Sequence, residues 1–274
     1  MYLLPNAKIN IGLNIINNRD DGYHDLQTVF YPIPLTDALE IQPQKSNQDI
    51  EFYCSGIKIP DSKNNNLVMK IFRSLQKEFQ LPPIIINLSK HIPIGAGLGG
   101  GSSDAAFMMK MLNEYFSLDL SNYEMEKRLS EIGADCAFFI RNKATYAEGV
   151  GNVFSDIDIN LSKYFLALVK PNIHISTKQA YANVVSKRPL IDLNTAIERT
   201  PIENWSENIK NDFESSLFHA FPQLSIIKQT LYDIGAVYAS MTGSGSALYG
   251  IFNRPIDNLS KIFPDCFTFF HELS

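Results

Sequence analysis

Hydrophobic and polar residues alternate strictly over residues 8–15, close to the start of the chain. The apolar residues, all isoleucine or leucine, fall on one face of an extended segment, and Lys8 and Asn10 fall on the other. Because successive side chains of a strand point to opposite faces, this pattern predicts a β-strand with one face in the hydrophobic core. Its polar face presents Lys8 and Asn10 together, so both side chains can reach one cleft.

Apolar runs separated by turn residues continue along the rest of the first half of the chain. The pattern predicts a turn at 20–22, strands at 27–33, 38–42, 50–54 and 83–90, helices at 67–79, 104–116 and 121–132, and a hairpin at 146–153. Helix 104–116 can take its N-cap from Ser102, Ser103 or Asp104, because short polar side chains satisfy the first free N–H groups of a helix.

Past residue 155 the pattern restarts. It predicts strands at 165–170, 237–241, 247–252 and 266–271, and helices that begin near Ser176, cross 192–218 irregularly, span 222–234 and lie near 259. This β-α-…-α-β-β-α-β order is typical of a split βαβ, ferredoxin-like fold. We therefore expect an α+β protein of two domains, residues 1–155 and residues 156–274.

Composition and charge exclude several classes of protein. Hydrophobic residues make up 45% of the 274 residues and charged residues 19%, a globular balance that allows two modest domains. The net charge of −5, without a basic run, argues against a nucleic-acid partner. The three cysteines lie far apart and form no C-x-x-C, so neither a disulfide framework nor a zinc site is indicated.

The apolar runs also argue against membrane insertion. The first residues lack the basic and long apolar regions of a signal peptide, and the longest apolar runs, such as 164–169, have the length of strands. We expect a cytoplasmic protein with a small-molecule substrate and without a membrane or nucleic-acid partner.

A glycine-rich segment joins the strand at 83–90 to the helix at 104–116. From Pro93 it reads Pro-Ile-Gly-Ala-Gly-Leu-Gly-Gly-Gly-Ser-Ser. Glycine lets the backbone adopt positive φ and approach a ligand closely, and the helix that follows presents free N–H groups and the positive end of its dipole. Ser102 and Ser103 add hydroxyl groups that can bond a phosphate or a magnesium-bound water. The segment therefore predicts an anion-binding loop.

Three other interpretations of this loop are weaker. Gly95, Gly97 and Gly100 satisfy G-x-G-x-x-G, but a dinucleotide-binding domain places that motif in an early βαβ unit, and here a long strand-rich segment precedes it. A Walker A loop needs Gly-Lys-Ser/Thr, and this loop contains no lysine. A flexible linker would not be flanked so closely by a strand and a strong helix.

The loop and several other segments resemble the motifs of one family. They are Pro93-x-x-x-Gly97-Leu98-Gly99 with Ser102-Ser103-x-Ala105-Ala106, Ala7-Lys8-Ile9-Asn10, Asp21-Gly22-Tyr23-His24, Gly133-Ala134-Asp135 with Phe138-Phe139, Ala147-Glu148-Gly149-Val150-Gly151, and Met241-Thr242-Gly243-Ser244-Gly245. Five ordered motifs besides a glycine loop are hard to obtain by chance. On these segments the chain resembles the GHMP kinases over nearly its whole length.

The resemblance implies a fold and an activity. It implies a two-domain α+β fold, with a mixed sheet and helices in the N-terminal domain, a ferredoxin-like C-terminal half and an active site in the cleft between them. It also implies ATP as the phosphoryl donor, with Mg²⁺ but without a dedicated set of protein ligands for the metal, and a monomer or weak homodimer. The implied ATP-binding residues are Pro93, Ile94, Gly95, Ala96, Gly97, Leu98, Gly99, Gly100, Gly101, Ser102, Ser103 and Lys90.

The same resemblance implies roles for the acceptor side. Asp135 would take the proton of the acceptor hydroxyl, and Lys8 would orient that hydroxyl and stabilise charge. Tyr23 would stack on a cytosine, His24 would hydrogen-bond its edge, and an aromatic residue would lie on the opposite side of the base. The implied substrate-binding residues are Asn10, Tyr23, His24, Thr177, Tyr181, Gly243, Ser244 and Gly245, the last three closing on a diphosphate.

Each of these residues also has a structural interpretation. Lys8 can be a solvated lysine, and Asp135 can cap the next helix. Lys90, implied to lie near the adenine and ribose, can be a strand-end charge, and residues 243–245 can be a hairpin turn. One departure from the family is visible, since Cys136-Ala137 follows Asp135 where a branched apolar residue and a proline are expected.

The aromatic pair at Tyr23 and His24 decides between acceptors. The resemblance of Asp21-Gly22-Tyr23-His24 implies phosphorylation of the 2-hydroxyl of a cytidine-diphosphate-linked methylerythritol, because homoserine and mevalonate kinases of this family have no cytosine to read. Those kinases remain the alternative enzymes. A non-catalytic nucleotide-binding protein is a third hypothesis, against which the presence of both Lys8 and Asp135 argues.

Overall fold

The computed structural model describes residues 1–44, 49–59, 65–182, 184–189 and 191–273. The chain folds into two compact units. The first unit comprises Met1–Ala7, Leu35–Ile94 and Gly99–Lys143, and the second comprises Lys8–Pro34, Gly95–Leu98 and Ala144–Ser274. The glycine-rich loop is thereby divided, with Gly95–Leu98 in the second unit and Gly99 onward in the first. The expected division of the sequence into 1–155 and 156–274 stays a prediction.

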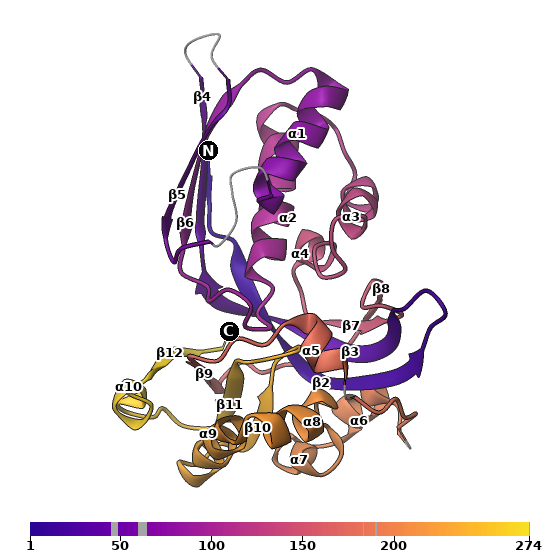
Figure 1. The fold of residues 1–274 in the computed structure, drawn as a ribbon, viewed down its shortest axis with the longest axis vertical. Coiled ribbons are helices and arrows are strands. Elements are labelled where there is room, and N and C mark those ends of the chain that lie inside the picture. Colours follow the sequence, from indigo (N-terminus) through magenta and orange to yellow (C-terminus); the bar gives the residue numbers. More distant parts are fainter. Residues whose placement is uncertain (45–48, 60–64, 183, 190, 274) are drawn as a thin grey trace. The chain divides into compact units, whose positions relative to one another are not determined.

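The first unit is built on a mixed sheet. Its strands are β1 (Tyr2–Leu3), β4 (Ala38–Pro43), β6 (Ile84–Lys90) and β5 (Glu51–Gly56), in the order β1-β4-β6-β5. Strands β5 and β6 are parallel, and the other pairs are antiparallel. Its helices are α1 (Leu67–Phe79), α2 (Gly100–Tyr115), α3 (Asn122–Ser130) and α4 (Phe138–Arg141). Figure 1 shows α1 and α2 side by side against this sheet.

Helix α1 illustrates why the first unit folds as it does. Asn66 caps it by accepting a hydrogen bond from the Val68 N–H, and the side chains of Val68, Met69, Ile71, Phe72 and Leu75 are buried. This spacing places the apolar residues on one face of the helix. Gln80 ends the helix in the left-handed conformation. The helix predicted at 67–79 is confirmed.

The second unit contains two sheets. One has the order β2-β3-β7-β8, formed by β2 (Asn6–Asn18), β3 (His24–Thr36), β7 (Thr145–Glu148) and β8 (Val153–Asp156). The turn at 20–22 and the hairpin at 146–153 are confirmed. The alternation predicted at 8–15 is present in β2, and both of its faces are buried, including the polar face with Lys8 and Asn10.

The other sheet of the second unit is ferredoxin-like. Its strands are β9 (Phe165–Pro171), β10 (Tyr238–Met241), β11 (Leu248–Phe252) and β12 (Cys266–Glu272), and every paired neighbour is antiparallel in the order β10-β11-β9-β12. The helical elements are α5 (Thr177–Ala182), α6 (Leu193–Arg199), the 3₁₀ helix η1 (Ile202–Asn204), α7 (Trp205–Asn208), α8 (Phe213–Ala220), α9 (Pro222–Asp233) and α10 (Leu259–Ile262). Figure 1 shows α8 and α9 beside β10 and β11.

Helix α9 follows from its sequence. Pro222 stands at the start, where its missing N–H costs nothing, and Leu224, Ile227 and Leu231 recur on one buried face. These residues share a hydrophobic cluster with Leu13 and other residues of β2 and of the ferredoxin-like sheet. The core of the second unit therefore extends from that sheet to β2, the strand that carries Lys8.

Candidate active site

The glycine-rich loop leads directly into α2. The helix begins at Gly100, four residues before the predicted start, and its N-cap is Gly99 at φ 69°. The expected N-cap at Ser102, Ser103 or Asp104 is therefore wrong, because those residues already lie inside the helix. No side chain caps α2. The N–H groups of its first turn stay available for an anion, a ready-made phosphate site at the positive end of the helix dipole.

The earlier part of the loop is held by the second unit. The Thr242 hydroxyl donates to the Gly97 carbonyl at 3.0 Å, the Ala247 N–H donates to the Ala96 carbonyl at 3.2 Å, and the Lys8 N–H donates to the Leu98 carbonyl at 3.0 Å. Gly97 has φ 77°, and a Cβ atom built there would lie 2.0 Å from the Thr242 carbonyl oxygen. Only glycine fits this position. Thr242 belongs to the late glycine loop, so that loop packs on Gly97 and is not merely a hairpin turn.

Lys8 is buried in a polar network of the second unit. Its side chain is 2% exposed, and its ammonium donates to Asn10 Oδ1 at 2.6 Å and lies 4.9 Å from the centroid of the Phe30 ring. Asn10 in turn donates to Thr28 Oγ1 at 2.9 Å, which donates to the Gly12 carbonyl at 2.6 Å. The interpretation of Lys8 as a solvated lysine is wrong. The sequence analysis did not find Thr28, since a lone threonine in a strand has no distinguishing pattern.

The aromatic residues expected to read a base come together in part. The His24 and Tyr181 rings lie 4.5 Å apart between centroids, and Tyr181 makes an edge contact with Phe213 at 4.8 Å. Tyr23 is 65% exposed, and its backbone N–H is held by Asp21 Oδ1 at 3.0 Å. The sequence analysis missed Phe213, because nothing in its local pattern distinguishes it from a core residue.

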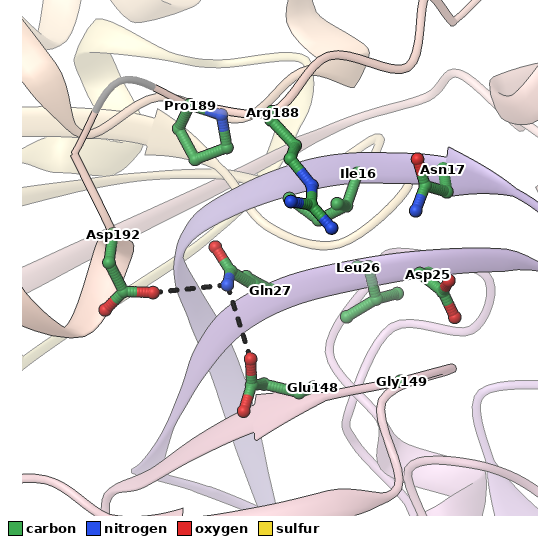
Figure 2. Close-up of a pocket in the computed structure, with 10 residues that line it drawn as sticks. All are labelled: Ile16, Asn17, Asp25, Leu26, Gln27, Glu148, Gly149, Arg188, Pro189 and Asp192. Carbon is green, nitrogen blue, oxygen red and sulfur yellow. Dashed lines mark hydrogen bonds between the residues drawn. The ribbon is translucent and has the colours of Figure 1, made fainter.

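A pocket of about 380 Å³ lies in the second unit (Figure 2). It is lined by Ile16, Asn17, Asp25, Leu26, Gln27, Glu148, Gly149, Arg188, Pro189 and Asp192. Gln27 Nε2 donates to Glu148 Oε1 at 3.3 Å and to Asp192 Oδ2 at 3.2 Å, as Figure 2 shows. Tyr146 donates to Asp192 Oδ2 at 3.0 Å, and burial raises the pKa of its phenol. These bonds tie the start of α6 to β3 and β7. None of the predicted site residues lines this pocket.

The segment around Asp135 connects α3 to α4 in the first unit. The N-cap of α4 is Ala137, and no side chain caps this helix. The interpretation of Asp135 as a helix cap is therefore wrong. The neighbouring Cys136 is buried and its N–H donates to the Gly133 carbonyl at 3.1 Å. Burial raises the pKa of the Cys136 thiol to about 11, so this thiol stays protonated at neutral pH.

Lys90 is buried in the first unit with two carboxylates. Its side chain is 3% exposed, and its ammonium donates to Asp104 Oδ2 at 2.6 Å and to Asp37. Lys90 is a charge at the end of strand β6, but it is buried and paired with carboxylates instead of solvated. Burial raises the pKa of Asp104 to about 7 against the attraction of Lys90, and the nearby Asp37 carboxylate adds to the increase. The sequence analysis named Asp104 only as a possible cap and did not name Asp37.

The remaining predicted substrate-binding residues lie in the second unit. Thr177 is the first residue of α5, and Gly243, Ser244 and Gly245 form the late loop of the second unit. Across the described residues, no group of three or more histidine, cysteine, aspartate or glutamate side chains gathers in a way that could hold a metal ion. Among the described helices, none is both long and apolar enough to cross a membrane.

Comparison with known proteins assigns the class. A model of the N-terminal domain of GHMP kinases matches residues 66–143, and a model of their C-terminal domain matches residues 193–263. The chain belongs to the GHMP kinase family, whose members transfer a phosphoryl group from ATP to a small molecule. The expected resemblance and the expected two-domain α+β fold of this family are confirmed.

More similar relatives narrow the class. The chain is 50% identical over 275 residues to a 4-diphosphocytidyl-2-C-methyl-D-erythritol kinase of Bacteroides fragilis, with 100% of both chains covered. It is 51% identical over 253 residues to the enzyme of that name from Bacteroides thetaiotaomicron, with 92% of each chain covered. A crystal structure of 4-(cytidine 5'-diphospho)-2C-methyl-D-erythritol kinase matches with a TM-score of 0.74 at 28% identity, covering 92% of this chain and 90% of that one. A mevalonate kinase structure at 16% identity, with a TM-score of 0.70 over 98% of both chains, shares the fold.

The contact between Gly97 and Thr242 leads to a first prediction. We expect Gly97→Ala to lower the free energy of unfolding by at least about 2 kcal/mol, because a side chain both disfavours positive φ and meets the Thr242 carbonyl. For a protein of this size that loss lowers the Tm by about 4–8 °C, which differential scanning calorimetry measures.

Gly101→Ala is the matched control. Gly101 lies in the first turn of α2 with nothing within 4 Å of an added Cβ, and alanine stabilises a helix by about 1 kcal/mol over glycine. We expect its Tm to equal or exceed that of the parent. Equal melting temperatures for the two variants would contradict the assigned role of Gly97.

The buried carboxyl of Asp104 leads to a pH prediction. Its pKa is raised on folding, so its contribution to stability is present below the unfolded pKa near 4 and is lost as the pH rises to about 7. Asp104→Asn removes this titration. We therefore expect the unfolding free energy of the parent, minus that of the variant, to fall steadily between pH 4 and pH 7 in denaturant titrations. A difference that does not change with pH would show that Asp104 keeps an ordinary pKa.

Proposed function

We propose that this chain phosphorylates the 2-hydroxyl of 4-(cytidine 5'-diphospho)-2-C-methyl-D-erythritol with ATP, a step of non-mevalonate isoprenoid precursor biosynthesis. The contact between the His24 and Tyr181 rings carries this proposal. An aromatic pair on one unit suits a planar base, and homoserine or mevalonate presents none. The names of relatives about 50% identical over the full length point to the same acceptor.

Three aromatic residues would divide the recognition of cytosine. We propose that Tyr181, held at its edge by Phe213, offers a stacking face, and that the exposed Tyr23 closes on the other side of the base. His24 would supply ring nitrogens to the base edge. Asn10, Thr177 and residues Gly243, Ser244 and Gly245 would contact the rest of the acceptor, the three loop residues at its diphosphate.

The glycine-rich loop would bind the ATP triphosphate. We propose that the residues from Pro93 to Ser103 hold the phosphates mainly through backbone N–H groups, because α2 begins at Gly100 without a side-chain cap. Lys90 would belong to the same ATP site. Mg²⁺ would accompany ATP on phosphate oxygens and water, as this ion keeps several waters, and would compensate charge on the transferred phosphoryl.

Asp135 and Lys8 would act on the acceptor hydroxyl. We propose that Asp135 receives the hydroxyl proton and that the Lys8 ammonium orients the oxygen and stabilises negative charge. The bond from Lys8 to Asn10 and the contact with Phe30 fix the rotamer of the lysine, which supports a positioned cation. We further propose a cytoplasmic enzyme that is a monomer or weak homodimer.

A panel of acceptors tests the proposal. In a coupled ADP-release assay with ATP, we expect turnover with the cytidine-linked sugar alcohol and none above background with homoserine, mevalonate or galactose. Turnover of homoserine or mevalonate alone would show that the proposed acceptor is wrong. If no alcohol is turned over, the result would favour a non-catalytic nucleotide-binding protein.

Tyr181→Ala sharpens the same test. Stacking contributes ~1–3 kcal/mol per base, so we expect the acceptor KM to rise about ten-fold or more while the ATP KM stays near that of the parent. A rise confined to the ATP KM would show that Tyr181 belongs to the ATP site and not to the acceptor site. Tyr123→Ala, a change at another tyrosine, 71% exposed on α3, is the control.

The chemical roles lead to a further prediction. Asp135→Asn removes the proton acceptor and keeps the shape of the side chain, so we expect kcat to fall by at least about 10² with the Tm unchanged. Lys8→Met should reduce kcat by a similar factor, measured at saturating substrates. The double variant should lose less than the product of the two factors if both residues act on one hydroxyl. A fully active Asp135→Asn enzyme would show that the proton of the acceptor hydroxyl passes to solvent or to the phosphate and not to Asp135.

A further inference from the structure

The residues on either side of the phosphate loop are joined by three buried charged side chains, here called the triad: Asp37, Lys90 and Asp104. Their exposed fractions are 0%, 3% and 3%. Lys90 is the last residue of β6, just before the loop, and Asp104 is the fifth residue of α2, just after it. The single ammonium contacts both carboxylates, with 2.6 Å from Lys90 Nζ to Asp104 Oδ2. The triad therefore closes the base of the loop.

Asp37 holds the residues that lead into the loop. Its Oδ1 accepts the N–H of His91 at 2.5 Å and the N–H of Ile92 at 2.8 Å. On the trailing side, a Cβ atom built on Gly100 would lie 2.9 Å from Ile92 Cγ2 and 3.4 Å from Lys90 Nζ. Residues 90–92 and the start of α2 are thus packed against each other and linked through charges. All of these residues belong to the first unit.

Stability alone gives a poor reason for this arrangement. With both carboxylates ionised the triad carries a net charge of −1 in a site from which water is excluded. In the described part of the chain, Asp104 Oδ1 and Ser103 Oγ are buried without a hydrogen-bond partner. When a buried ion pair is replaced by apolar residues of similar volume, the protein is often equally stable or more stable. What an apolar replacement cannot supply is a directional link between two specified points of the backbone.

We propose that Asp37 and Asp104 are positioning residues for ATP, and that Lys90 serves the ATP site through them. By fixing the two ends of the loop, the triad orders the N–H groups of the loop and of the first turn of α2 before ATP arrives. Ordering in advance removes an entropic cost from binding. The inference rests on the proposed identity of this loop as the ATP loop, and on no property of the acceptor.

A double-mutant cycle on ATP affinity tests the proposal. Lys90→Met and Asp104→Leu are made singly and together, and the Kd of a non-hydrolysable ATP analogue is measured by isothermal titration without acceptor. Since both changes break one link, we expect about a ten-fold rise in Kd for each single variant and no more than about that rise for the double variant. In steady-state assays the ATP KM should rise in parallel, with kcat at saturating ATP and the acceptor KM within about two-fold of the parent.

Two further variants separate position from stability. Asp104→Asn keeps an oxygen that accepts from Lys90, so its Kd should stay within about three-fold of the parent. Leu112→Ala removes a buried side chain farther along α2 and lowers the Tm without touching the loop; its Kd should not change. If Leu112→Ala raises the Kd as much as the triad variants do, the triad affects ATP binding only through the stability of the fold.

The other outcomes are also decisive. If Lys90→Met weakens ATP while Asp104→Leu binds as the parent does, Lys90 contacts the nucleotide directly and the proposal is wrong. If the two effects multiply, the residues act independently and the proposal is equally wrong. Lys90→Met leaves two carboxylates without their lysine and can fail to fold. In that case the Kd values of Asp104→Leu and of the double variant are compared, since neither variant carries a larger net charge at the triad than the parent. Because the titration contains no acceptor, an error in the proposed acceptor leaves its result unchanged.

Discussion

The close approach of two backbones at Gly97 is the constraint on which the second unit depends. The Thr242 carbonyl occupies the space where any side chain at Gly97 would stand, and the Thr242 hydroxyl bonds the Gly97 carbonyl. The same hydroxyl accepts the N–H of Asn10 at 3.0 Å, and the oxygen of the Asn10 side chain accepts from Lys8. A glycine of the glycine-rich loop, a late-loop threonine and a buried lysine are therefore coupled through three consecutive contacts. Displacement of any one of them would displace the others.

Among the described residues, two lysines are buried, one in each unit, and the oxygens they contact are of different kinds. In the first unit, the ammonium of Lys90 contacts the carboxylates of Asp37 and Asp104. In the second unit, the ammonium of Lys8 contacts an amide oxygen and the face of an aromatic ring.

The fold by itself does not determine which alcohol is phosphorylated. A mevalonate kinase shares the fold at 16% identity, and its TM-score of 0.70 is close to the 0.74 of the cytidine-linked sugar kinase structure. The difference between acceptors must therefore lie in side chains that the common scaffold presents. The side chains proposed here to recognise a cytosine are aromatic and lie on the second unit, with His24 on a strand, Tyr181 on α5 and Phe213 on α8. Specificity is thus a property of a few positions on a shared framework.

The sequence by itself determined most of the elements and the glycine-rich loop. Strands, helices and the ferredoxin-like order follow from local periodicity and turn residues, which depend on neighbours only a few positions away. The glycines predicted a loop because backbone freedom is an intrinsic property of that residue. Local reasoning was wrong about the start of α2, which begins at Gly100 with Gly99 as its N-cap and without a side-chain cap.

Only the tertiary structure decided which polar residues are buried together. Asp37 lies 53 positions from Lys90, and Thr242 lies 145 positions from Gly97, so no local pattern connects either pair. Lys8, Lys90 and Asp135 each had an ordinary surface or capping interpretation in the sequence, because a single charged residue in a strand or turn is usually solvated. Burial and hydrogen-bond geometry removed those interpretations. Such contacts arise only when distant segments pack, since the cost of burying a charge forces its partners to converge on it.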